Sequence, residues 1–239
     1  MFYRKHLIVF CSLFIFIACN EDLKIAFTEI NVSTDQNSIV EINIPEANGN
    51  DMIANHINTK IQKTIISALD IGYQDDATSK SVEESISSFN NQYNTFKNDF
   101  PETKQKWDAQ IDGEVIYESF EIISIAITAY VNTGGAHGNL NISFLNFNAE
   151  TGHVIPNSKL FHDVKAFKKT AKPYFDKTVA DKDITLNTNS FDLPSNIAYT
   201  EDGIVLLYNT NEIAPYSTGI IEFIVPYDKA NPYLVFNSF

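Results

Sequence analysis

The spacing of apolar residues changes from a helical to a strand-like period near Pro101. Before it, residues 53–69 place isoleucines and a leucine at four-residue intervals, which is typical of an amphipathic helix. Residues 82–100 repeat a helical pattern at alternating spacings of four and three, and Ser81 with Glu84 forms a capping box ahead of it. The sequence therefore predicts two helices before Pro101, which ends the second.

Beyond Pro101, apolar and polar residues alternate with the two-residue period of β-strands. The alternating segments are residues 107–111, 123–131 and 140–144, and residues 40–44 repeat the pattern in front of Pro45, which we expect to close that strand. Gly113 allows two interpretations. With Asp112 it forms a two-residue hairpin turn, or it is a bulge in one longer strand that ends near Glu118.

The C-terminal part carries one more helical pattern and a hairpin signal. Residues 160–175 have apolar side chains at helical spacing, and Pro173 should strain or end that helix. Apolar runs at 197–199 and 204–208 flank the turn sequence Thr-Glu-Asp-Gly, and residues 220–225 form a last strand. This order of elements predicts an α+β fold with a mostly antiparallel sheet and amphipathic helices packed on one face.

The N-terminus has the composition of a signal peptide. Arg4 and Lys5 precede an apolar run, residues 7–18, that meets Cys19. The run is shorter than the about 20 residues of a membrane-spanning helix. Small Ala18 directly before Cys19 fits a lipoprotein cleavage site, whereas an ordinary secretory signal with a chance cysteine is the alternative. We predict lipidation at Cys19 and a lipid-anchored, extracytoplasmic protein of the bacterial cell envelope.

Cysteine and arginine usage restrict the chemistry of the chain. Cys11 lies inside the leader, so the mature fold has no disulfide and no thiol-based site. Removing Arg4 and Lys5 with the leader takes the formal net charge from −13 to −15, and leaves no arginine. Such a chain repels phosphate backbones, so we expect no nucleic-acid partner, whereas basic proteins are steered toward it.

Several short segments resemble one known family in their order and spacing. The chain is similar to the extracellular domain shared by the anti-sigma factor RsiV and the N-terminal part of the peptidoglycan deacetylase PdaC, a pair of domains of unknown function. The resemblance covers about residues 39–234. Its segments are residues 130–138, 147–152 and 159–161 in the first half, and residues 200–208, 211–216 and 225–227 in the second.

The resemblance implies a domain organisation and a class of function. It implies two intimately associated halves that share one sheet system, and recognition of lysozyme, as in RsiV. We expect the leader at residues 1–18, a tether at 19–36, a PdaC/RsiV-like half at 37–155 and an RsiV-like half at 156–239. Deacetylase activity is not expected, because no paired Asp with a downstream His-x-x-x-His zinc signature is found. Anti-sigma activity is not expected either, because we find no counterpart of the sigma-binding segment and transmembrane helix of RsiV.

The candidate binding residues lie in two loops and one neighbouring strand. Gly134 and Gly135 let the backbone approach a partner closely and His137 offers a polar tip, although a wide hairpin would use the same glycines. Tyr208 and Tyr216 are further candidates because tyrosine is enriched at interfaces. The loop that holds Tyr216 either presents this side chain to a partner or uses it for its own packing.

No sequence pattern for catalysis or metal binding emerges. His137, His153 and His162 match no metal-ligand spacing, so we predict neither a metal nor a cofactor. Gly-x-Ser-x-Gly and His-Glu-x-x-His are absent from the sequence, so no catalytic residue is assigned. The predicted function is non-catalytic recognition of a basic secreted protein such as lysozyme, or of peptidoglycan. The alternative is a cell-wall hydrolase with an unrecognised carboxylate site.

Overall fold

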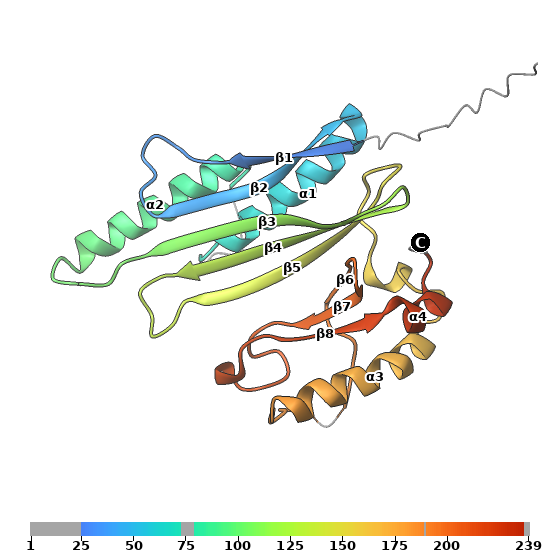
Figure 1. Cartoon of the computed structure of the whole chain (residues 1–239). Coiled ribbons are helices and arrows are strands. Elements are labelled where there is room, and N and C mark those ends of the chain that lie inside the picture. Colours follow the sequence, from blue (N-terminus) through green and yellow to red (C-terminus); the bar gives the residue numbers. More distant parts are fainter. Residues whose placement is uncertain (1–24, 73–78, 189, 237–239) are drawn as a thin grey trace, which may run out of the picture.

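The computed structural model describes residues 25–72, 79–188 and 190–236 as two sheets, each covered by helices (Figure 1). The leader and Cys19 lie outside the described residues. The strands are β1 (Ile25–Asn31), β2 (Val40–Gly49), β3 (Asp108–Glu118), β4 (Ile122–Asn132), β5 (Asn139–Asn148), β6 (Asn196–Tyr199), β7 (Gly203–Tyr208) and β8 (Ile221–Pro226). The α-helices are α1 (Asp51–Leu69), α2 (Val82–Asp99), α3 (Val164–Asp181) and the short α4 (Tyr227–Ala230).

The fold is α+β and mostly antiparallel, which confirms the predicted class. The first sheet has the order β1-β2-β3-β4-β5, and only its β2-β3 pair is parallel among the described strands. The second sheet has the order β6-β7-β8 and is antiparallel. The expectation of one sheet system shared by both halves is therefore wrong. No helix in the described parts of the chain is long and apolar enough to cross a membrane.

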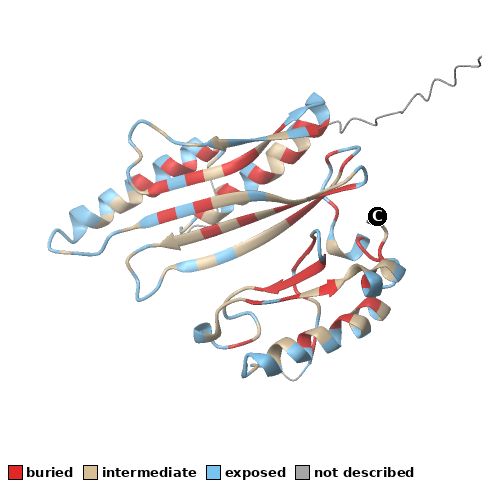
Figure 2. Cartoon of the chain, viewed as in Figure 1, coloured by how far each residue is buried: buried red, intermediate tan, exposed pale blue. Residues whose placement is uncertain are grey.

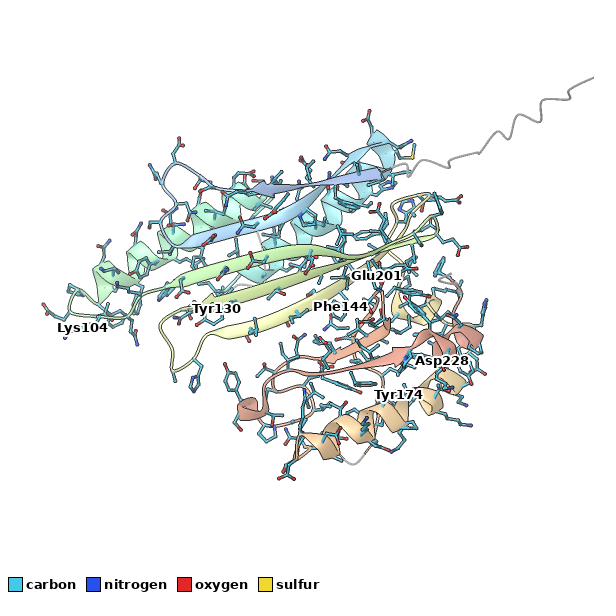
Figure 3. The ribbon with its side chains drawn as sticks, viewed as in Figure 1. Lys104, Tyr130, Phe144, Tyr174, Glu201 and Asp228 are labelled. Carbon is cyan, nitrogen blue, oxygen red and sulfur yellow. The ribbon has the colours of Figure 1, made fainter. Side chains whose placement is uncertain are left out.

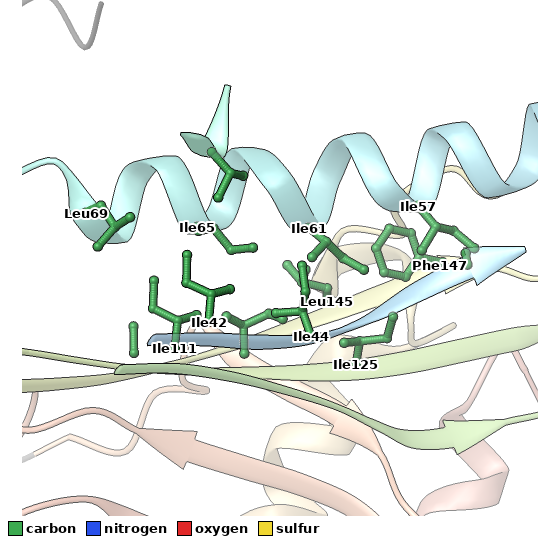
Figure 4. Close-up of a cluster of buried hydrophobic side chains, with 14 of the residues drawn as sticks. Ile42, Ile44, Ile57, Ile61, Ile65, Leu69, Ile111, Ile125, Leu145 and Phe147 are labelled. Atoms are coloured by element: carbon green, nitrogen blue, oxygen red, sulfur yellow. The ribbon is translucent and has the colours of Figure 1, made fainter. Parts of the chain in front are cut away.

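Each half has its own hydrophobic core. In the first, shown in Figure 4, Ile57, Ile61 and Ile65 on the inner face of α1 share a core with Ile42 and Ile111 of the sheet. All five are fully buried. Burial of each such side chain contributes about 1.5–3 kcal/mol, so the four-residue spacing of α1 fixes which of its faces meets the sheet.

The second core lies between α3 and the three-stranded sheet (Figure 2). Phe175 of α3 contacts Phe223 of β8 edge-on, with ring centroids 5.8 Å apart. Every residue of β7 is buried, because this strand lies between β6 and β8 with α3 on one face and the first half near the other. The alternating pattern of a half-exposed strand is therefore missing from β7.

The start of α2 follows its predicted cap, but α3 does not stop where its proline suggests. The Ser81 side chain accepts a hydrogen bond from the Glu84 amide at 3.2 Å, and α2 ends at Asp99, just before Pro101. In contrast, α3 continues through Pro173 to Asp181. Pro173 is exposed, so water can reach the carbonyl that loses its helical donor. Of the two effects expected of Pro173, straining the helix or ending it, the second is therefore wrong.

Proline and glycine also act differently from prediction in the first sheet. Pro45 does not close β2, because beyond it the strand pairs only with β1 and runs to Gly49. Gly113 is not a hairpin turn: β3 is one long strand that ends at Glu118, as the second interpretation predicts, but its register shift lies between Val115 and Tyr117 and not at Gly113. A Cβ atom at Gly113 would lie 2.7 Å from Cδ of Pro45. Gly113 is thus required because the Pro45 ring packs on its backbone.

The segment expected to be a tether is partly folded. Residues Ile25–Asn31 form β1, which pairs with β2 from Ile25 opposite Gly49 to Asn31 opposite Asn43. As an edge strand, β1 needs only one buried face, and Ile25 supplies its buried side chain. The expected tether, residues 19–36, is therefore shortened by this strand.

Asparagine side chains join the two halves along the outer edge of β5. Asn209 accepts from the Ile142 amide at 2.8 Å and donates to the Ile142 carbonyl at 2.9 Å. Asn196 accepts from the Phe144 amide at 2.9 Å. Phe144 is labelled on β5 in Figure 3, where this strand faces the second half. Amides of the second half thus take the place of a sixth strand and satisfy the edge of the first sheet.

Candidate binding surface

Two connecting segments leave the first sheet at the end that lies opposite to the start of the described chain. Asp108 pairs with Asn132, and Val131 pairs with Asn139, so the 100–107 segment and the 133–138 loop leave the sheet at the same end. Ile25 pairs with Gly49 at the other end. We call the end with the 100–107 segment and the 133–138 loop the distal end, and the surface there the distal surface. Lys104 marks this end in Figure 3, whereas Glu201 and Asp228 lie toward the other end.

The 133–138 loop packs against the segment that follows α2. Gly134 has a φ of 81°, and its amide donates to the Asn132 side chain at 2.9 Å. A Cβ atom at Gly134 would lie 2.9 Å from Cβ of Gln105, so glycine is needed for both the positive φ and the close approach. Gly135 has no positive φ, and a Cβ atom there would meet only the His137 carbonyl oxygen, at 3.7 Å. Gly134 therefore has a structural role in this hairpin.

The same loop contacts Tyr216 from the second half. The Tyr216 hydroxyl donates to the Gly138 carbonyl at 2.7 Å, and the Tyr216 and His137 rings stack with centroids 5.3 Å apart. A Cβ atom at Gly138 would lie 2.3 Å from the Tyr130 ring, so this glycine lets the chain pass close to β4. Tyr216 is nevertheless 46% exposed. The structure thus brings together Gly134, His137 and Tyr216, and leaves an aromatic pair open to solvent.

Tyr208 does not belong to this surface. Only 3% of it is exposed, and it lies in the second core with its ring centroid 5.7 Å from that of Phe175. Its hydroxyl donates to the Asp192 carbonyl, and burial raises its pKa above the usual range. The interpretation of Tyr208 as a contact residue is wrong because it lies in the central strand of a three-stranded sheet.

Sequence reasoning missed an exposed aromatic cluster next to the 133–138 loop. Phe100 is 59% exposed and packs on Phe96, which stacks on Trp107 at 5.5 Å. A hollow of about 810 Å³ borders Phe96, Phe100 and Trp107, and its rim carries carboxylates from α2, including Asp99. The helical pattern assigns Phe96 and Phe100 to the core. Phe100 is instead exposed and Phe96 is half-buried, because the end of α2 extends past the sheet (Figure 1).

The histidines with candidate metal-ligand chemistry do not converge. His153 stacks on His56 with ring centroids 4.0 Å apart, and a ring nitrogen of His56 lies 2.8 Å from the Thr151 carbonyl. His137 instead stacks on Tyr216. Within residues 25–72, 79–188 and 190–236, no three His, Cys, Asp or Glu side chains gather in a way that would hold a metal ion.

Comparisons with known proteins agree with this two-part architecture. Residues 32–140 match the family model described as Deacetylase PdaC, and residues 152–228 match the Protein of unknown function (DUF3298). Among curated proteins, no match to the sequence was found. The gap between the two matches, residues 141–151, holds most of β5 and the turn that follows it.

Two solved structures share the fold. A DUF3298 family member from Bacteroides fragilis superposes with a TM-score of 0.65 at 19% identity, over 90% of this chain and 95% of its own. A DUF3298 family protein from Pseudomonas aeruginosa PAO1 gives 0.60 at 18% identity, over 89% and 94%. The chain has the fold of DUF3298 proteins. Along the chain, the segment that matches the PdaC model precedes the segment that matches the DUF3298 model.

Proposed function

We propose that this protein is a non-catalytic recognition module of the bacterial cell envelope, and that its distal surface binds a basic secreted protein of the lysozyme kind. The observation that carries the proposal is the solvent-exposed Tyr216–His137 pair on hydrogen-bonded loops. Tyrosines held in one conformation supply contact area at small entropic cost, and aromatic anchors provide most of the energy of many interfaces.

The position of the surface supports a tethered receptor. The described chain begins at Ile25, at the end of the sheet opposite the 133–138 loop. A lipid on Cys19, six residues earlier in the sequence, would hold that end near a membrane and leave Tyr216 facing away from it. Replacement of Cys19 by serine should abolish acyl labelling and leave precursor or released protein. Unchanged membrane attachment of that variant would argue against the lipid anchor.

Charge supports a basic partner. The chain carries 30 acidic residues against 17 basic ones, and Asp99 with Glu102 lies beside the exposed Phe100 at the distal end. A negative surface accelerates encounter with a cationic protein, and this acceleration falls as salt rises. Association with lysozyme should therefore slow with increasing ionic strength.

Replacement of Tyr216 by alanine should weaken lysozyme binding by about tenfold or more, because it removes an aromatic anchor from the centre of the proposed interface. Isothermal titration calorimetry at low ionic strength measures the dissociation constant. Phe120→Ala is the matched control: Phe120 is 55% exposed, and it lies in the turn between β3 and β4 at the opposite end of the sheet. Absence of heat with lysozyme, or equal effects of both variants, would refute binding at the distal surface.

The alternative, a hydrolase that uses carboxylates, has less support. Burial raises the pKa of the Glu118 carboxyl group, and a general acid requires such a raised pKa. Glu118 ends β3, which places it at the opposite end from the 133–138 loop. It borders neither the hollow beside Phe96 nor the Tyr216 loop. The non-catalytic function is therefore the better proposal.

A further inference from the structure

A shallow trough runs along the exposed side of α2 and ends at the distal surface, where α2 extends past the sheet (Figure 1). It consists of the hollow of about 810 Å³ next to the aromatic cluster and a second hollow of about 610 Å³. Phe96, Asp99 and Phe100 border both hollows. Along α2 the bordering residues form two neighbouring rows of four-residue spacing, which begin at Glu83 and Glu84. We call this surface the α2 trough.

The α2 trough has the shape of a surface that accepts a second helix. From Glu83 to Asp99 it is about 24 Å long at the rise of an α-helix. Two adjacent rows of side chains are what one helix presents to another when ridges pack into grooves. The rows carry short, exposed polar side chains at Ser87, Ser88 and Thr95, which let the backbone of a second helix come close. A helical peptide of about 18 residues therefore fits along the trough.

The distal end of the trough is apolar. Phe100 is 59% exposed, and Phe96 and Trp107 are half-buried. The Phe96 ring contacts both others, with centroid distances of 5.3 Å to Phe100 and 5.5 Å to Trp107. A single exposed phenylalanine is ordinary on a protein surface, but three grouped rings offer a large contact area to the apolar side chains of a ligand.

The charged side chains along the trough all have the same sign. Its acidic residues, all exposed, are Glu83, Glu84, Asp99 and Glu102. No lysine of the described chain borders the trough, and these carboxylates take part in none of the ion pairs among the described residues. Lys97, in the last turn of α2, lies over the Tyr93 ring at 5.9 Å instead. The trough is therefore complementary to a cationic ligand.

We propose that the α2 trough binds a cationic amphipathic peptide in helical form. The apolar side chains of the peptide lie on Phe96, Phe100 and Trp107, and its basic side chains face the carboxylates along the trough. The ligand is a free peptide, which is a different class of molecule from the folded protein proposed as the partner of Tyr216. The inference goes beyond the proposed function and does not depend on it.

The probe is a synthetic peptide of about 18 lysines and leucines, with the leucines at helical spacing on one face. Trp107 is the one tryptophan of the chain, so its fluorescence reports on the trough directly. Titration of the purified protein with this peptide should change the emission of Trp107, because the bound helix covers its ring. Binding should weaken as salt rises.

Two comparison peptides separate the apolar face from the charge. A peptide of the same composition in scrambled order keeps the charge but loses the apolar face, so it should bind about tenfold more weakly or worse. A peptide with glutamate in place of every lysine should not bind. Equal affinity of the scrambled peptide, binding of the acidic peptide, or unchanged emission up to about 100 µM of the first peptide would overturn the proposal.

Pairs of lysine substitutions on α2 separate the trough from the net charge of the chain. Ser87→Lys with Asn91→Lys places two long positive side chains in the trough and should weaken peptide binding by about tenfold or more. The matched control, Asn94→Lys with Asn98→Lys, makes the same change in charge at two exposed positions of α2 that do not border the trough. It should change the affinity by less than about threefold, because salt screens exposed charges. Equal losses in the two variants would overturn the site.

The aromatic end has its own matched pair of variants. Phe100→Ala should weaken binding of the lysine–leucine peptide by about fivefold or more, because it removes an exposed aromatic anchor. Phe120→Ala removes a similarly exposed ring at the opposite end of the sheet and should leave the affinity unchanged. Equal affinities of these two variants for the peptide would overturn the assignment of the trough.

The two proposals fail independently. Tyr216→Ala should leave the affinity for the peptide unchanged, and the variant with lysines at Ser87 and Asn91 should keep the dependence of lysozyme binding on Tyr216. A loss of peptide binding in Tyr216→Ala would place the peptide on the 133–138 loop and so would refute the trough.

Discussion

Replacement of Gly152 by alanine should lower the free energy of unfolding by about 3 kcal/mol, because it combines an unfavourable backbone conformation with a clash against main chain. Gly152 has a φ of 70°, and a Cβ atom there would lie 2.4 Å from the Ile53 carbonyl oxygen. That carbonyl belongs to the first turn of α1, so it cannot move aside as a flexible side chain would. Either the turn after β5 or the start of α1 must shift.

Urea denaturation followed by circular dichroism measures this loss. The control is Gly135→Ala, where φ is not positive and the atom nearest to a new Cβ is the His137 carbonyl oxygen at 3.7 Å. That substitution should change stability by less than about 0.5 kcal/mol. Similar losses in both variants would mean that the contact between Gly152 and α1 does not limit stability.

The helices and most strands could be predicted because their apolar spacing reports burial on one face. The Ile57, Ile61 and Ile65 repeat identified the inner face of α1, and Thr-Glu-Asp-Gly located the β6–β7 hairpin. Proline was less informative. Pro45 and Pro173 interrupt neither element, because the pairing of β2 with β3 ends at Asn43, before Pro45, and because Pro173 lies at an exposed position of α3. Such neighbours are set by tertiary structure, and local sequence does not encode them.

The candidate site was only partly predictable for a similar reason. Loop residues such as Gly134 and His137 were found from turn composition, but their contact with Tyr216 joins residues far apart in sequence. Tyr208 was misassigned because the residue type alone does not show whether a tyrosine is buried in a strand or exposed at an interface. The α2 trough carries no motif, since the apolar spacing of α2 reports only its buried face and Trp107 comes from beyond Pro101.

Replacement of Asn146 by leucine should also destabilise the protein by about 3 kcal/mol, because its amide makes two buried hydrogen bonds, one with Ser124 of its own sheet and one with Ile197 of the second half. Asn146 is 2% exposed; it donates to the Ile197 carbonyl and accepts from the Ser124 hydroxyl, both at 2.7 Å. Ser124 in turn accepts from the Tyr199 amide at 3.3 Å. Leucine shares the branched shape of asparagine and leaves no cavity, but it forms no hydrogen bond with either polar neighbour. The loss of unfolding free energy therefore measures the cost of burying polar groups without partners.

The control is Asn141→Leu on the same strand, where the side chain is exposed and its amide bonds only to Ser143 at 3.3 Å. Its stability should stay within about 0.5 kcal/mol of the parent. Hydrogen exchange adds a readout specific to the junction: in Asn146→Leu, the amide of Tyr199 should exchange faster, while that of Ile61 in the first core should follow global stability. Because each half has its own core, weakening the bonds between them should loosen the second sheet before the first. Equal stability of the two leucine variants would show instead that the Asn209 and Asn196 bonds to β5 are sufficient to hold the halves together.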